Sequence, residues 1–281
     1  MVKIIKDKNP YVLDAVDDPS RMVALTRKNA DFIKAVIRLD SNYGDVSVVQ
    51  SPSTEFDPEN GSSSSNKKNR GSVAYWFGEM KKSNCDFRKC VLGAIIAIDS
   101  TNSTHLEAAE LIVNGKVSAS GRKAMRDIVC EHCKNHSDLV KMLNTPFDAD
   151  NKNHLISLLS TKTVSKKDGN ARYNLSFATK FCSYASLLLG ASIDYSRFDN
   201  IVSDSLPKYE QIYLKRTVKP KEYKIEYEKT KKMDDDEKYQ YRLKIYQKYA
   251  NTIQDILNAL KKDGISLTKD EFDQIVWYTQ K

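Results

Sequence analysis

The chain contains no apolar run long enough to cross a membrane. Its best run, Val91 to Ile98, is far shorter than the roughly 20 residues of a membrane-spanning helix, so we expect a core element there. Residues 1–8 lack the apolar core and the small-residue cleavage site of a secretory signal. The five cysteines are odd in number and follow no regular spacing, which fits reduced thiols better than a disulfide framework. We therefore expect a cytoplasmic protein with no disulfide and no membrane partner.

Charge of one sign is in moderate excess. The 281 residues include 45 Lys and Arg against 37 Asp and Glu, which gives a formal net charge of +8 and a pI near 9.0. This balance favours a polyanionic partner, because side chains that neutralise phosphates release counterions. Many basic proteins bind no nucleic acid, so the net charge alone is weak evidence for a nucleic-acid partner. With 40% hydrophobic residues, the chain can bury the core of one large domain or two small ones.

The sequence divides into an N-terminal helical region, residues 1–100, and a second helical domain, residues 101–281. Within the first region, residues 51–71 are rich in Ser, Asn, Gly and Lys. Such a composition buries too little apolar surface to offset the entropy cost of ordering the chain. We expect a mobile surface loop there.

Apolar residues recur at helical spacing through most of the chain, which indicates an all-α class. The predicted helices of the second domain are 104–113, 122–133, 138–143, 154–159, 175–189, 194–202, 215–260 and a final helix that starts after Thr268. Gly115 and Gly190 are expected to end the helices before them. Thr268 and Glu271 have the spacing of a capping box at the start of the last helix.

Two segments of the sequence resemble a known active-site region. Tyr173 to Cys182, YNLSFATKFC, and Ile193 to Phe198, IDYSRF, resemble the active-site region of helix-hairpin-helix DNA glycosylases, nearest to 8-oxoguanine DNA glycosylase-like proteins. In that family a small or hydroxyl residue precedes a catalytic lysine at the start of a helix, and an apolar residue precedes an aspartate at the start of the next. The two matching dipeptides are Thr179-Lys180 and Ile193-Asp194.

The resemblance covers residues 120–281, is specific over 173–198, and implies two helical subdomains with the active site between them. Lys180 is then the amine nucleophile and Asp194 the carboxylate beside it. Breaking an N-glycosidic bond builds positive charge on the sugar, which a carboxylate stabilises, and an amine can trap the anomeric carbon as a Schiff base. The implied activities are excision of a modified base, nearest to an oxidised purine, and AP-lyase strand cleavage. No metal or other cofactor is implied.

Further site residues follow from base extrusion and DNA binding. An extruded base is held by stacking and edge hydrogen bonds, so its pocket should be aromatic, and the candidates are Phe177, Tyr184, Tyr195 and Trp277. Ordinary core packing is the alternative for each of these aromatics. The family usually holds a phosphate with a Gly-rich turn before the lysine, which this chain lacks. Contacts with the DNA backbone are therefore expected from Asn174, Ser176 and Arg197.

Both catalytic candidates have a structural alternative. Lys180 can be a helix lysine whose stem lies on an apolar face, and Asp194 can be the N-cap of the next helix. Lys180 to Leu188 rises about 12 Å as a helix, and the return to Asp194 spans at most about 17 Å. The two side chains can therefore meet only if residues 190–193 are extended, since a helix there would separate them.

Two further features have alternative interpretations. Cys130 and Cys133, with Cys85 and Cys90 as remote partners, invite a zinc site, but cysteines three apart on an amphipathic helix are more often packing residues, so no metal is predicted. The Lys- and Tyr-rich stretch 215–248 can follow a DNA backbone, yet a charge run is usually a solvated helix face.

The leading prediction is a monomeric, nucleoid-associated DNA N-glycosylase whose partner is DNA that contains a modified base. Three alternatives remain open. The first is an antiviral defence enzyme that excises a bulky modified base from phage DNA. The second is a non-catalytic DNA-binding module on the same scaffold, and the third is an all-α interaction protein.

Overall fold

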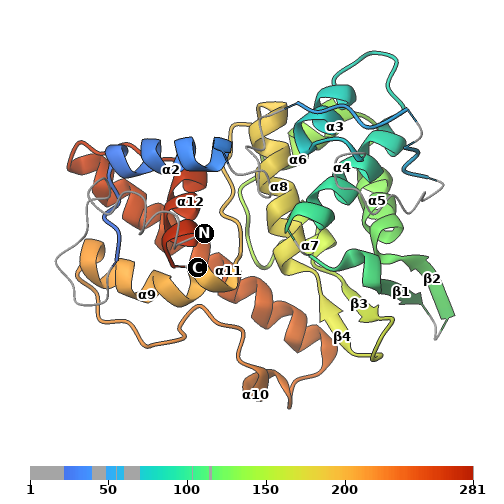
Figure 1. The fold of residues 1–281 in the computed structure, drawn as a ribbon. Coiled ribbons are helices and arrows are strands. Elements are labelled where there is room, and N and C mark those ends of the chain that lie inside the picture. Colours follow the sequence, from blue (N-terminus) through green and yellow to red (C-terminus); the bar gives the residue numbers. More distant parts are fainter. Residues whose placement is uncertain are drawn as a thin grey trace. The chain divides into compact units, whose positions relative to one another are not determined.

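The computed structural model describes residues 22–39, 49–54, 56–59, 70–102, 104–113 and 116–280. These residues are mainly helical (Figure 1). They fall into two compact units, one within residues 46–194 and one made from residues 1–45 together with 195–281. The expected boundary after residue 100 lies inside helix α4 (Phe87–Asn102). Of the loop expected over 51–71, residues 55 and 60–69 lie outside the described residues.

In the unit within 46–194, the other helical elements are α3 (Val73–Met80), η2 (Leu106–Ala108), α5 (Gly121–His132), α6 (His136–Leu143), α7 (Leu155–Leu159) and α8 (Leu175–Leu189). Helix α8 packs against α3, α4, α6 and α7. The core run of α4 contacts α3 so closely that a Cβ on Gly93 would lie 2.3 Å from the ring of Trp76. The apolar run of α4 is a core element, and none of the described helices is long and apolar enough to cross a membrane.

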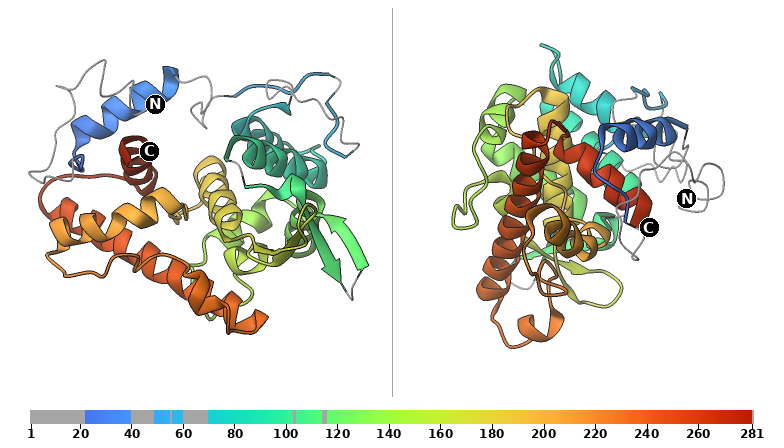
Figure 2. Two further views of the ribbon diagram at one scale, coloured as in Figure 1. Left: turned by 60° about the horizontal axis from the view of Figure 1, so that its bottom comes forward. Right: turned by 90° about the vertical axis from the view of Figure 1, so that its left-hand side faces the viewer.

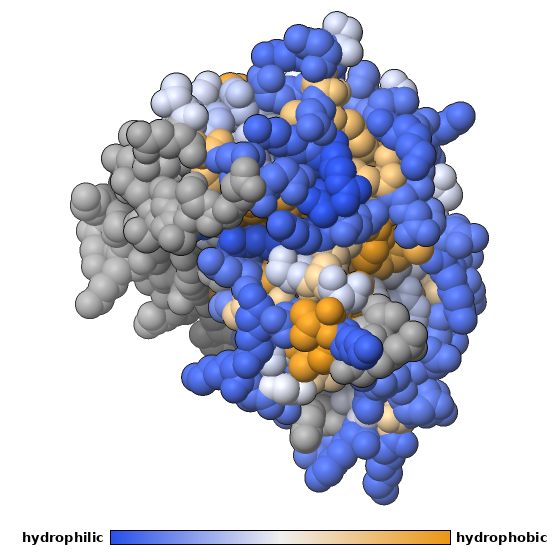
Figure 3. Space-filling view, turned by 90° about the vertical axis from the view of Figure 1, so that its right-hand side faces the viewer, coloured by the Kyte–Doolittle hydropathy of each residue, from blue (hydrophilic) through white to orange (hydrophobic). Residues whose placement is uncertain are grey.

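A four-stranded antiparallel sheet completes this unit, so the all-α prediction is wrong in this respect. The strands are β1 (Ala109–Val113), β2 (Lys116–Ser120), β3 (Lys162–Ser165) and β4 (Ala171–Tyr173), in the order β2-β1-β3-β4. The helix expected over 104–113 is instead the turn η2 followed by β1. Asn114-Gly115 is a strong hairpin signal between two strands, and Val113 pairs with Lys116 across it. Figure 3 shows the face that carries this hairpin, which is mainly hydrophilic with scattered apolar areas.

The other unit contains α2 (Arg27–Leu39), α9 (Asn200–Leu214), α10 (Tyr227–Thr230), α11 (Asp235–Lys262) and α12 (Lys269–Gln280). Helix α9 packs against α11, and α12 packs against α2, α9 and α11 (Figure 2). Its core is rich in tyrosines that are fully buried but keep their hydroxyl groups hydrogen-bonded. Tyr209, for example, donates to the carbonyl of Val23 at 3.0 Å. Such pairing removes the cost of burying a polar group.

The helix predicted to open at Asp194 begins six residues later, at Asn200, so that prediction is wrong. Asp199 is the N-cap, because its carboxylate accepts the N–H of Ile201 at 2.9 Å. The preceding residues are non-helical. Tertiary contacts hold them, since Tyr246 and Tyr249 of α11 donate to the carbonyls of residues 196 and 197 at 2.9 and 2.8 Å.

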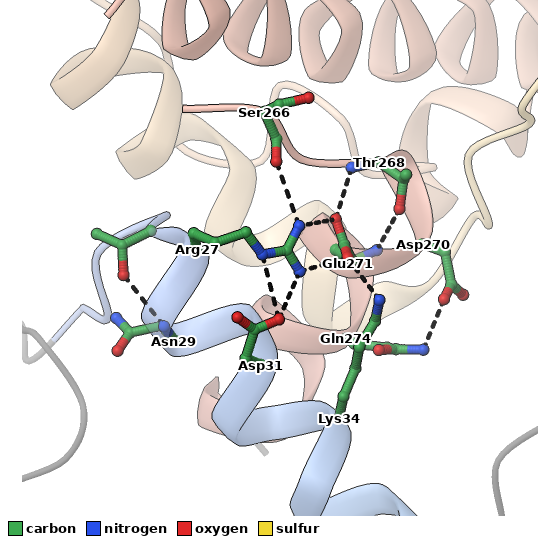
Figure 4. Close-up of polar contacts among 10 residues, drawn as sticks. Arg27, Asn29, Asp31, Lys34, Ser266, Thr268, Asp270, Glu271 and Gln274 are labelled. Carbon is green, nitrogen blue, oxygen red and sulfur yellow. Dashed lines mark hydrogen bonds and ion pairs between the residues drawn. The ribbon is translucent and has the colours of Figure 1, made fainter. Parts of the chain in front are cut away.

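Helix α12 begins at a capping box that also receives two cations. Glu271 N–H donates to the Thr268 hydroxyl at 3.2 Å and Thr268 N–H donates to the Glu271 carboxylate at 2.9 Å, which confirms the predicted box. Arg27 and Lys34 of α2 bind the same carboxylate at 2.5 and 2.6 Å (Figure 4). Burial alone would raise the pKa of Glu271, but hydrogen bonds from Arg27, Lys34 and the Thr268 backbone outweigh it and lower this pKa to about 2.

We expect Glu271→Gln to lower the free energy of unfolding by about 2 kcal/mol at pH 7. A carboxyl whose pKa is lower in the folded state stabilises that state fully above the pKa of the unfolded chain. This contribution is lost as the pH falls through the folded-state pKa of about 2. The stabilities of wild type and variant should therefore converge as the pH is lowered below about 4.5, which urea unfolding measures.

Asp31→Asn is the matched control, because it removes an exposed carboxylate that binds the same Arg27. Exposed ion pairs contribute little, so its cost should stay below about 1 kcal/mol. A stability difference for Glu271→Gln that does not change between neutral and acidic pH would contradict the assigned role of the carboxylate.

Candidate active site

Helix α8, which carries Lys180, is anchored to the sheet at its start. The side-chain amide of Asn174 donates to the Thr161 carbonyl at 2.9 Å and to the Thr163 hydroxyl at 3.2 Å. This N-cap residue therefore binds β3 and leaves the N–H groups of α8 without a side-chain cap. Strands β3 and β4 form a hairpin around Gly169, so a β-hairpin leads directly into α8.

Lys180 lies in the second turn of α8 among buried aromatic side chains. It is 8% exposed, and no other lysine among the described residues is buried. The rings of Phe177 and Phe181 on the same helix are 5.9 Å apart, and Phe181 lies 5.7 Å from Phe77 of α3. A lysine is almost never buried to this extent unless its amine has a partner. Lys180 is therefore not a solvated helix lysine.

The chain reverses direction directly after α8. Gly190 has a left-handed backbone with φ 80°, which ends the helix at the predicted position. The N–H groups of Gly190 and Ala191 donate to the carbonyl of Ser186 at 3.0 and 2.9 Å. The hydroxyl of Ser186 then donates to the carbonyl of Ile193. This hydroxyl–carbonyl bond lies about one helical turn before the end of α8, so the chain returns along the helix toward its start.

A second anchor comes from α6. The side-chain oxygen of Asn144, the C-cap residue of α6, accepts the N–H of Ser192 at 2.7 Å and its hydroxyl at 2.8 Å. Residues 191–199 contain no helix. The non-helical return required for Lys180 and Asp194 to meet is therefore present.

The two anchors define how far Asp194 lies from Lys180 along α8. Lys180 and Ser186 are six residues apart, which is about 9 Å along the helix axis. Asp194 follows Ile193, whose carbonyl is bound at Ser186, so its backbone starts about that far along the axis from the lysine. Asp194 is exposed, and both residues belong to the same compact unit.

Two of the predicted pocket aromatics lie on α8 beside Lys180. Phe177 and Tyr184 are 1% and 4% exposed, and share a helix face with the lysine at spacings of three and four residues. The hydroxyl of Tyr184 donates to the side chain of Asn102 in α4 at 3.0 Å. Both residues are therefore packed into the core of their unit.

The other two predicted aromatics belong to the second unit. Tyr195 is 4% exposed at the start of the segment that precedes α9. Trp277 is half-buried on α12, with its ring 4.9 Å from that of Tyr278 in an edge arrangement. Of the four aromatics, Trp277 has the most exposed surface.

The residues expected at the DNA backbone differ in how far they are engaged inside the protein. The guanidinium of Arg197 is 8% exposed and forms ion pairs with Asp270 at 2.6 Å and Asp273 at 2.9 Å, both in α12. The amide of Asn174 binds β3 as described above. Ser176 is only partly buried, so its position is the most accessible of the three.

The cysteines are all free thiols. Burial raises the pKa of Cys130 and raises that of Cys133 to about 12. The sulfur of Cys133 contacts the sulfur of Met142 at 3.3 Å. Within the part of the chain that the structure describes, no three His, Cys, Asp or Glu side chains are placed to hold a metal ion.

Two residues that build the return, Ser186 and Asn144, were not identified from the sequence. Ser186 lies in a helical run of small and apolar residues, where a hydroxyl carries no distinctive signal. Asn144 is 48 positions from the residue that it binds, so only tertiary structure shows the contact. The local signal that existed was Gly190, which marked the chain reversal.

Comparisons with family models, with curated proteins and with solved structures give no match. The resemblance to helix-hairpin-helix glycosylases therefore depends on the residues of segment 173–198 themselves. A function must be argued from the geometry and chemistry of the site.

We expect Lys180→Met to leave the thermal midpoint unchanged or to raise it. Methionine fills a similar volume, and replacing a buried ionic group by an apolar one is often neutral or stabilising. Lys180→Ala should lower the free energy of unfolding by about 2 kcal/mol, because it removes the buried methylene groups of the stem. Thermal and urea unfolding measure both variants. If Lys180→Met destabilises the protein as much as Lys180→Ala, the amine has a structural role.

Proposed function

We propose that the protein is a DNA N-glycosylase that excises a modified base, with Lys180 as the nucleophile and Asp194 as the assisting carboxylate. A Schiff base between Lys180 and the sugar adds AP-lyase activity. The proposal joins the resemblance of residues 173–198 to helix-hairpin-helix glycosylases with the positions of the two residues along α8.

One observation carries the proposal. The one buried lysine in the described part of the chain lies on the same helix along which the backbone returns to an exposed aspartate. A lysine attacks carbon through its amine, and the buried position of Lys180 on α8 fixes where that amine starts from. Ser186 and Asn144 hold the backbone that leads to Asp194. A carboxylate on a fixed backbone needs less reorganisation to stabilise a transition state than one on a mobile loop.

The proposed reaction uses both residues at the anomeric carbon C1′. The N-glycosidic bond breaks, its electron pair leaves with the base, and the base takes up a proton from solvent. The carboxylate of Asp194 stabilises the positive charge on the sugar. Nζ of Lys180 forms a bond to C1′ and loses a proton, and opening of the sugar ring gives the Schiff base. Elimination of the 3′ phosphate from this intermediate cleaves the strand.

The excised base is selected by the shape of the pocket. An oxidised purine is the first candidate, because the resemblance is nearest to 8-oxoguanine DNA glycosylase-like proteins. A bulky modified base of phage DNA is the second, and its removal would make the protein an antiviral defence enzyme. Both substrates give the same covalent intermediate, so one assay covers them.

Borohydride trapping on duplexes and single strands that carry oxidised or bulky modified bases should give a covalent adduct with the wild type. Lys180→Met should give none, because it lacks the amine. Asp194→Asn should slow base release by about 100-fold, as expected for loss of a group that stabilises transition-state charge. Lys152→Ala, which removes an exposed lysine of the same unit, is the control and should react as the wild type.

Each outcome separates the candidate functions. Base release without an adduct would indicate a glycosylase that activates water through Asp194. DNA binding without release or adduct, across the whole panel, would favour the non-catalytic DNA-binding module. An adduct that persists in Lys180→Met would show that another amine is the nucleophile.

A further inference from the structure

A cluster of positive charge lies outside the proposed catalytic site, between α9 and α10. Residues 215–224, which we call the basic segment, contain five basic residues and one acidic residue, Glu222. The basic residues are Lys215, Arg216, Lys219, Lys221 and Lys224. The segment belongs to the unit of α9, α11 and α12 and follows α9 in the orange part of the ribbon (Figure 1).

The basic segment is held against α9 and α11 by a buried tyrosine. Tyr223 is fully buried, donates its hydroxyl to Glu210 of α9, and lies 3.0 Å from the hydroxyl of Thr252 in α11. Three ion pairs add further links: Arg216 to Asp255, Lys224 to Asp204 and Glu222 to Lys248. The fold therefore fixes the backbone of this segment, so its remaining side chains start from defined positions.

Three lysines of the segment form no ion pair within the described residues, although Lys219 assists Lys248 in lowering the pKa of Glu222. Lys215, Lys219 and Lys221 are exposed, and no ion pair with another described residue involves them. Lys231 and Lys232, further along the chain, differ because the acidic first turn of α11, with its N-cap Asp234, follows them directly. The positive field of those two lysines is partly cancelled by that acidic turn.

Two of these lysines also have an unfavourable backbone conformation. Lys215 has φ 56° and Lys221 has φ 68°, and His105 is the only other described non-glycine residue with a positive φ. Lys215 is the C-cap of α9, a position at which glycine has no steric penalty. Backbone strain of this kind concentrates at functional sites. A lysine where glycine would fit better indicates that the side chain has a use.

We infer that Lys215, Lys219 and Lys221 form a surface that binds the phosphate backbone of DNA. Residues 215 and 221 can lie up to about 20 Å apart, which exceeds the reach of a single phosphate group but matches a row of phosphates. Duplex DNA presents one negative charge per about 1.7 Å of its axis, and lysine binds phosphate as a point charge. The inference extends the proposed function by giving the DNA a second contact, in a unit that does not contain Lys180.

The test measures binding to an undamaged, fluorescently labelled short duplex by anisotropy over a series of salt concentrations. The variant is K215Q/K219Q/K221Q, and the control K244Q/K261Q/K262Q removes the same charge from exposed positions on α11. The slope of log affinity against log salt should fall by about 0.9 for each phosphate that a lysine no longer neutralises, so by about 2 to 3 for the variant. Affinity near 0.1 M salt should fall by about tenfold or more. The control should change the slope by less than half as much.

A glycine pair separates charge from folding. K215G/K221G removes two of the same charges but relieves the backbone strain, so it should weaken DNA binding while leaving the thermal midpoint unchanged or higher. Equal slope changes in the variant and the α11 control, or full affinity in the glycine pair, would overturn the inference. Equally tight binding to anionic phospholipid vesicles would also overturn it, in favour of a membrane surface.

These outcomes are independent of the proposed catalysis. If only the inference fails, K215Q/K219Q/K221Q binds undamaged DNA as the wild type does and the Lys180 adduct still forms. If only the proposed glycosylase activity fails, no adduct forms but the salt slope still falls in the variant.

Discussion

Burial of α8 is the constraint on which the unit within residues 46–194 depends. Helices α3, α4, α6 and α7 all pack against it, and most of its side chains are buried. Its start is tied to β3 by Asn174, and its end is fixed by the left-handed Gly190. A helix with so little freedom holds each side chain in one environment. Lys180 is therefore held among aromatic side chains, where a lysine is costly unless it has a partner or a function.

The end of the same helix determines where Asp194 can lie. Carbonyl groups in the last turn of a helix have no partner within the helix, and the reversing chain supplies N–H groups to that of Ser186. The hydroxyl of Ser186 then binds the carbonyl before Asp194, and Asn144 binds Ser192. The path to the aspartate thus follows from helix termination and not from a flexible loop. Preorganised charge of this kind is what a reaction with a cationic transition state requires.

Local signals predicted some elements well and tertiary contacts decided the rest. The bounds 175–189 and the Thr268 capping box followed from apolar spacing, a stop glycine and a short-range side-chain exchange. The sheet was missed because Asn114-Gly115 was taken as a helix stop, although it is also a hairpin signal. The start of α9 was placed at Asp194 because the sequence does not show that α11 holds residues 196 and 197 in a non-helical backbone. The two anchors of the return join residues too distant for local reasoning.

The cations of this chain are of two physical kinds. Arg27 and Lys34 bind a buried carboxylate, and burial and pairing together stabilise the fold. Lys180 and Lys215 differ, because one places an amine among buried aromatic rings and the other occupies a backbone conformation that favours glycine. A glycine would adopt the left-handed backbone of Lys215 with less strain. The two proposals give each of these lysines a contact with DNA, as the nucleophile at the sugar for Lys180 and as a phosphate contact for Lys215.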